Sequence, residues 1–136
     1  MELKPTPTRD GFGEEITALG RTNKDIVVVS GDLEDATRAE YFKKEFPERF
    51  FNLGIAEQDV VGTAAGLSTQ GFVAFATSFA VFLTNRAYDM IRLDIATTIA
   101  MSRWYAPMAA SPSGKTGPAP NAWKILPSCA FCRTSR

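Results

Sequence analysis

One carboxylate and two aromatic rings in the middle of the chain have the spacing of a small-molecule site. Glu57 lies at an expected strand-to-helix turn, in the run Gly-Ile-Ala-Glu-Gln, and Phe79 and Phe82 follow on a second such turn. An acid shielded from water beside an aromatic slot suits a flat, basic heteroaromatic ring, since desolvation favours the protonated carboxyl. These residues therefore predict a site that holds such a ring by its edge and its face.

The elements that must position these residues alternate between helix and strand. Apolar periodicity and turn residues predict strands at 25–30, 49–53 and 71–77, and helices at 9–20, 36–46, 57–68 and 79–94. This alternation indicates a parallel sheet covered by helices on both faces, where ligands bind beyond the carboxyl ends of the strands. Asp32, Glu57 and residues 78–82 all follow such ends, so we expect them to meet at one edge.

Bulk composition excludes several classes of protein. The 136 residues indicate one domain, and 45% hydrophobic residues indicate a real core. Fifteen basic and fifteen acidic residues cancel, which argues against nucleic acid or an anionic membrane as the partner. The chain has no signal-like or membrane-spanning apolar run, so we expect it in the cytoplasm. It has no histidine, so acid–base work must fall to carboxylates, to a cofactor or to another chain.

The stretch 51–96, with its Gly-Ile-Ala-Glu-Gln and Thr-Ser-Phe-Ala-Val-Phe runs, resembles the pyrimidine-binding domain of transketolases. The resemblance covers about residues 10–96. It implies an α/β fold: the three-layer αβα, parallel-sheet pyrimidine-binding domain of thiamine-diphosphate enzymes, truncated after its third β-α unit. We accordingly expect a partial domain at 1–96 and a poorly ordered tail at 97–136.

The resemblance also implies roles for individual residues. Glu57 would be the catalytic acid on N1′ of the cofactor's aminopyrimidine, Phe79 and Phe82 would pack on that ring, and Asp32 would lie near the cofactor. Each residue has a plainer interpretation. Glu57 could simply occupy a helix's first turn, where the dipole favours anions. The phenylalanines could be core residues, and Asp32 an ordinary turn residue.

The family holds the diphosphate and its Mg²⁺ with a Gly-Asp-Gly…Asn motif on another domain. The run Gly31-Asp32-Leu33 lacks the second glycine, so no metal ligand is assigned to this chain. The resemblance implies that an N-terminal transketolase section or subunit supplies that site. The intact enzyme would be a homodimer or heterotetramer acting on sugar phosphates.

By the same resemblance, the expected activity is transfer of a two-carbon ketol unit between sugar phosphates, with this chain inactive by itself. Two close alternatives are a deoxyxylulose-phosphate synthase and a 2-oxoacid dehydrogenase β-subunit. An alternative from another class is a non-catalytic α/β assembly module.

Residues 97–136 lose the periodicity of the preceding chain and become rich in Pro, Ser and Trp. A single pyrimidine base missing after the Ala96 codon would explain the change, because restoring it allows a reading that continues the family pattern. Residues 107–110, for instance, then read His-Gly-Gly. Under this hypothesis the Cys-Ala-Phe-Cys run and the Ser-Gly-Lys-Thr run are accidents of the shifted frame.

Overall fold

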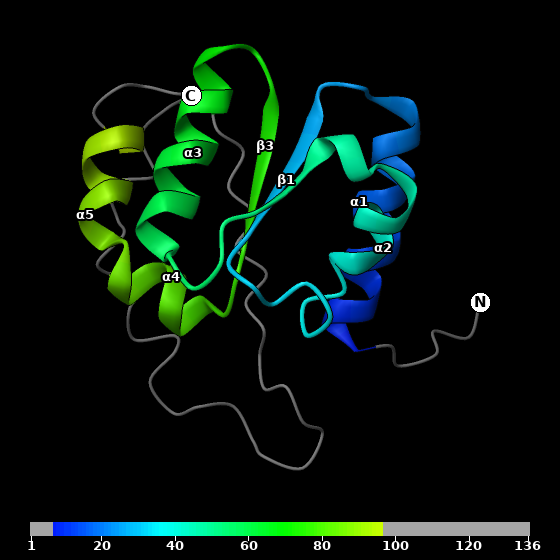
Figure 1. Ribbon diagram of the computed structural model, residues 1–136, viewed down its shortest axis with the longest axis horizontal. Coiled ribbons are helices and arrows are strands. Elements are labelled where there is room, and N and C mark those ends of the chain that lie inside the picture. The colour runs from blue at the N-terminus through cyan, green and yellow to red at the C-terminus, as the bar shows by residue number, and fades with distance from the viewer. Residues whose placement is uncertain (1–6, 97–136) are drawn as a thin grey trace.

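The computed structural model describes residues 7–96, which form three layers with a sheet between two groups of helices (Figure 1). The expected tail at 97–136 lies outside these residues. No helix within the described part of the chain has the length and apolar character that a membrane span requires. In chain order the elements are helix α1 (Thr8–Thr22), strand β1 (Ile26–Ser30), helix α2 (Glu40–Glu45), 3₁₀ turn η1 (Pro47–Arg49), strand β2 (Phe50–Asn52), helix α3 (Glu57–Thr69), strand β3 (Val73–Thr77), helices α4 (Ala80–Arg86) and α5 (Tyr88–Met90), and π-helical turn η2 (Ile91–Ala96).

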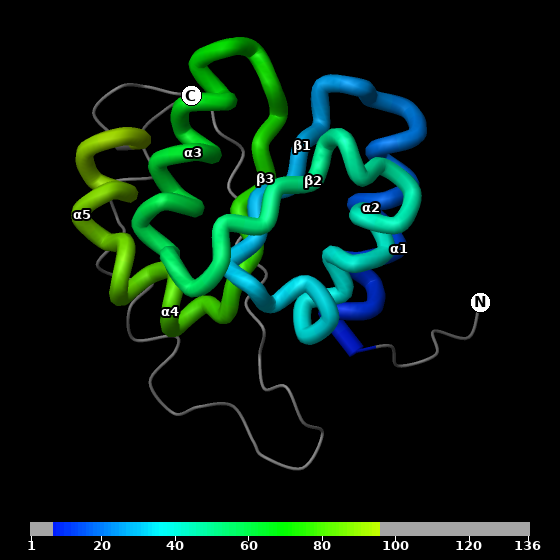
Figure 2. The backbone as a smooth tube through the Cα atoms, viewed as in Figure 1, coloured from blue at the N-terminus to red at the C-terminus, as the bar shows by residue number. Residues whose placement is uncertain are grey.

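The sheet has the order β2-β1-β3, and both pairings are parallel. Val28 of β1 lies opposite Phe50 of β2 and Phe75 of β3. The smooth trace in Figure 2 shows β2 running beside β1. The predicted parallel sheet is thereby confirmed, and its carboxyl ends lie at one edge.

Each face of the sheet carries its own hydrophobic core, because successive β1 side chains point to opposite faces. Val27 and Val29 pack with α3 and α4, whereas Ile26 and Val28 pack with α1 and α2. All five residues of β1 are buried. The continuous apolar run therefore predicted correctly a strand covered on both faces. The second core comprises Phe12, Ile16, Ile26, Val28, Ala39, Phe42 and Phe50.

Two helix boundaries differ from those predicted from the sequence. The first helix, expected to end near Gly20, continues to Thr22. Gly20 marks a close contact instead, because a Cβ there would lie 2.6 Å from the Phe42 ring. The helix expected at 36–46 begins only at Glu40. Residues before it form turns in which Arg38 has a positive φ of 62°, a conformation that an α-helix excludes.

The long helix expected at 79–94 is broken in the structure. Helix α4 ends at Arg86, and Ala87 leaves the helical conformation with φ −113° and ψ 22°. Ala87 is fully buried in the core on the α3 face. Tertiary packing here overrides a sequence of good helix formers, which propensity alone cannot anticipate. The break follows directly after Arg86.

Candidate functional site

The carboxyl ends of the three strands lie close together. The ladder extends beyond the strands, with Gly31 N–H donating to Thr77 O at 3.1 Å and Leu53 N–H donating to Ser30 O at 3.0 Å. A Cβ built on Gly31 would lie 3.6 Å from both Gly54 O and Ser78 Oγ. The turns after β1, β2 and β3 therefore form one compact edge, as the sequence predicted.

Glu57 is the first residue of α3, and only 4% of its surface is exposed. The chain reaches this position through a tight turn at Gly54, whose φ of +74° suits glycine. A glutamate in a helix's first turn is stabilised by the dipole, as the plainer interpretation holds. The dipole alone does not explain the burial of Glu57, because carboxylates are rarely buried unless they are paired.

The partner of Glu57 is Arg86, at the end of α4. Its Nη1 donates to Glu57 Oε1 at 3.0 Å and to Oε2 at 3.2 Å. The same guanidinium lies over the Phe82 ring, 4.1 Å from the ring centre. Sequence analysis gave Arg86 no role. Its position four residues after Phe82 was the available signal, because such pairs share one face of a helix.

Phe79 and Phe82 form the aromatic part of the site. Their ring centres are 5.7 Å apart and the rings are tilted by 45°. Phe79 is the N-cap of α4, and both side chains are only partly buried. Neither belongs to the two buried cores. The structure brings Phe82 and Glu57 together at one guanidinium. The predicted packing of the two phenylalanines on a cofactor ring stays a prediction.

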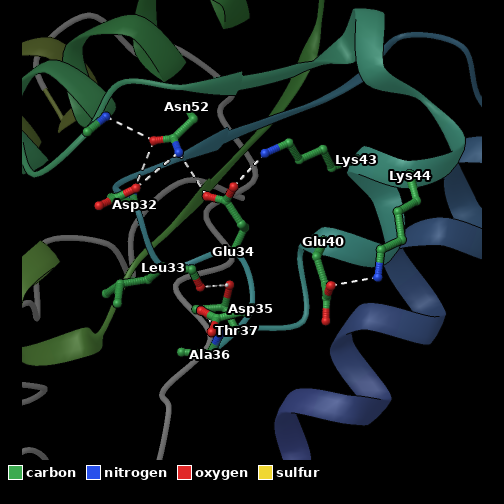
Figure 3. Close-up of polar contacts among 11 residues, drawn as sticks. Asp32, Leu33, Glu34, Asp35, Ala36, Thr37, Glu40, Lys43, Lys44 and Asn52 are labelled. Carbon is green, nitrogen blue, oxygen red and sulfur yellow. Dashed lines mark hydrogen bonds and ion pairs between the residues drawn. The ribbon is translucent and has the colours of Figure 1, made fainter.

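Asp32 lies on the turn after β1, is exposed, and forms its hydrogen bonds with the side chain of Asn52 (Figure 3). Asn52 Oδ1 accepts from Asp32 N–H at 3.2 Å, and Asn52 Nδ2 donates to Asp32 Oδ1 at 3.3 Å. The Asn52 side chain also donates from Nδ2 to Glu34 Oε2 and accepts at Oδ1 from Gly54 N–H. Asp32 therefore has a structural role in holding two turns together. Its predicted contact with a cofactor stays a prediction.

Two buried hydroxyls at this edge have no hydrogen-bond partner among residues 7–96: Ser30 Oγ and Ser78 Oγ. Buried polar groups normally find a partner, so these two mark a place where the described residues leave polar atoms unsatisfied. Across residues 7–96 no cluster of three His, Cys, Asp or Glu side chains is placed to hold a metal ion. The assignment of Mg²⁺ to a partner section stays a prediction.

The fold and this edge define a parallel α/β domain whose acid and aromatic residues follow strand ends. The chain matches the family model described as "Transketolase, pyrimidine binding domain" over residues 4–134. It therefore belongs to the pyrimidine-binding domain family of the transketolases, which are thiamine-diphosphate-dependent enzymes.

Individual relatives agree with this membership. The chain is 49% identical over 84 residues to a protein of Methanocaldococcus jannaschii described as a transketolase C-terminal section, covering 62% of this chain and 27% of that protein. It is 46% identical over 87 residues to transketolase-like protein 2 of Mus musculus, covering 63% and 14%. It is 42% identical over 84 residues to 1-deoxy-D-xylulose-5-phosphate synthase of Natranaerobius thermophilus, covering 62% and 13%.

A solved structure described as "Split gene transketolase, inactive beta4 tetramer" is similar in fold. The TM-score is 0.61 at 49% identity, and the match covers 67% of this chain and 30% of that one. The chain thus spans less than a third of the length of each of these relatives. The predicted boundary at residue 96 and the reading-frame hypothesis stay predictions.

Proposed function

We propose that this chain is part of the C-terminal section of a transketolase and transfers a two-carbon ketol unit between sugar phosphates when it is assembled with an N-terminal section. The burial of Glu57 beside Phe82 carries the proposal. An acid that is 4% exposed at the ligand-binding edge of a parallel sheet is placed to hydrogen-bond a ring nitrogen away from water.

The residues fit the aminopyrimidine of thiamine diphosphate. Glu57 offers a shielded carboxyl for the ring nitrogen, and Phe82, with Phe79 beside it, offers an aromatic face. The guanidinium of Arg86, a flat group, lies against both Glu57 and Phe82, and this supports the proposal of a flat ligand. When bound, the cofactor supplies the nucleophilic carbon that cleaves the sugar; this chain's residues orient the ring and control its protonation. Asp32 is proposed as a secondary contact.

The test is reconstitution with an N-terminal transketolase section and thiamine diphosphate. We expect no turnover from this chain alone. In the assembly, Glu57→Ala should lower kcat by at least about a hundredfold, the usual range for loss of an acid–base group. Asp59→Ala, an exposed acid on the same helix, is the matched control and should leave kcat unchanged. Equal turnover for Glu57→Ala would refute the assignment.

The similarity to a 1-deoxy-D-xylulose-5-phosphate synthase favours a second candidate reaction. That reaction takes a 2-oxoacid as donor and releases CO₂, whereas ketol transfer releases none. Supplying the assembly with pyruvate and measuring CO₂ therefore separates the two. Dependence of CO₂ release on Glu57 would move the proposal to the synthase.

A further inference from the structure

Arg86 occupies the space between the buried acid and the aromatic ring. One nitrogen of its guanidinium reaches both carboxylate oxygens of Glu57, at 3.0 and 3.2 Å. Its central carbon lies 4.1 Å from the centre of the Phe82 ring. A group at these distances uses the ring face that it covers and shares the carboxylate, so a second flat ligand cannot take the same place at the same time.

The guanidinium has the properties of the ligand for which this gap is suited. It is planar, delocalised and rich in N–H donors, and it stacks on aromatic faces. An aminopyrimidine is also planar and nitrogen-rich. The two nevertheless require opposite states of Glu57. An ion pair with Arg86 needs the ionised carboxylate, whereas a hydrogen bond donated to a neutral ring nitrogen needs the protonated acid.

The two partners also differ in mobility. Glu57 is fixed at the start of α3 and is almost wholly buried, whereas the Arg86 side chain is 49% exposed. Arg86 also ends α4, and the helical conformation breaks at the next residue. The arginine can therefore swing into solvent without moving the acid.

We propose that Arg86 is a displaceable internal occupant of the pyrimidine site, which pairs with Glu57 in the free chain and must leave before the cofactor ring binds. This inference rests on the proposed function. It makes ligand binding competitive with an intramolecular contact, so the apparent affinity is lower than the intrinsic affinity by the fraction of molecules in which the site is open.

The test measures binding rather than turnover, with thiamine as the probe. Thiamine carries the aminopyrimidine and lacks the diphosphate, so it requires no metal. We would titrate the intact 136-residue chain by saturation-transfer NMR, comparing Arg86→Met with Arg92→Met, the matched control on an exposed neighbouring arginine. Loss of the competing contact should tighten thiamine binding on the order of tenfold for Arg86→Met and leave Arg92→Met unchanged.

A second variant and a second readout guard against loss of folding. Arg86→Lys keeps the charge but not the flat stacking group, so its affinity should fall between those of the wild type and Arg86→Met. In the wild-type chain, thiamine should increase modification of Arg86 by phenylglyoxal, measured by peptide mass spectrometry. A merely structural ion pair would give no increase.

The outcomes separate the two proposals. Equal or weaker thiamine binding by Arg86→Met, or protection of Arg86 by thiamine, overturns the displacement model and leaves the pyrimidine site standing. Absence of thiamine binding in the wild type and in both Arg86 variants overturns the displacement model, whereas the proposed function falls only if Glu57→Ala keeps full turnover in the assembly. Tighter binding together with increased Arg86 modification supports both.

Discussion

Two glycines on α1 should respond to alanine in opposite ways. A Cβ on Gly13 would lie 2.6 Å from Arg38 Cβ, 2.6 Å from Arg38 O and 2.8 Å from the Tyr41 ring. Arg38 cannot move aside easily, because its positive φ and its 2.7 Å bond to Asp10 fix the turn. That bond also raises the pKa of Arg38, which stays charged. A Cβ on Gly11 would meet no atom within 4 Å.

The difference in free energy of unfolding between the two variants can be worked out because the effects common to both glycines cancel. Alanine restricts the unfolded chain similarly at both positions and improves helix propensity at both, by about 0.5–1 kcal/mol. Gly11→Ala should therefore raise the free energy of unfolding by about that amount. Gly13→Ala adds an overpacking cost of about 1–3 kcal/mol. The two variants should thus differ by about 1–3 kcal/mol, or roughly 5–15 °C in Tm for a domain of this size.

The assay is thermal unfolding of the intact chain, followed by circular dichroism at 222 nm for the wild type and both variants. We expect the Tm to be highest for Gly11→Ala, intermediate for the wild type and lowest for Gly13→Ala. A Gly13→Ala variant that melts at or above Gly11→Ala would refute the close approach of α1 to the turn before α2. Because both changes are Gly to Ala on one helix, a shared effect on the unfolded state cannot produce the ordering.

Three further results are expected. Arg49→Met should lower the free energy of unfolding, measured in urea, by about 2–4 kcal/mol, because the guanidinium of this 14%-exposed side chain donates to three backbone carbonyls and lies over two aromatic rings. The hydrogen bond from Arg21 lowers the pKa of Glu45. The stabilisation by this pair is therefore present above the ordinary carboxyl pKa and is lost as the pH falls through the lowered value. Arg21→Met should lower the free energy of unfolding at pH 7 and leave it unchanged at pH 2. Resequencing the gene across the Ala96–Thr97 junction should reveal an extra pyrimidine; an unchanged reading would contradict the frameshift hypothesis.

Much of the fold could be predicted because its signals are local. The β-branched run in β1 indicated a strand buried on both faces, and the turn residues placed Glu57 at the start of a helix. The edge at which the three turns meet followed from strand polarity alone. These inferences need only the chain's periodicity and direction, which the sequence states directly.

What could not be predicted depends on contacts between distant residues. The ion pair of Glu57 with Arg86 joins positions 29 apart, and nothing in the period of either helix requires it. The break at Ala87 arises from packing in the core on the α3 face. Gly20 of α1 likewise lies against the Phe42 ring, which approaches from another helix, so this glycine marks a contact and not the end of α1. Local propensity is overridden at each of these places by a tertiary neighbour.

The Asn52 amide has a consequence for chemical ageing. Its oxygen accepts from two backbone N–H groups, of Asp32 and Gly54, while its nitrogen donates to the carboxylates of Asp32 and Glu34. Deamidation to aspartate changes one NH₂ group to an oxygen and leaves the shape intact. It would nevertheless set a third carboxylate against two others and replace two attractive bonds with repulsion. The turns that hold the site together are therefore sensitive to the replacement of a single NH₂ group, at a residue that belongs to neither apolar core.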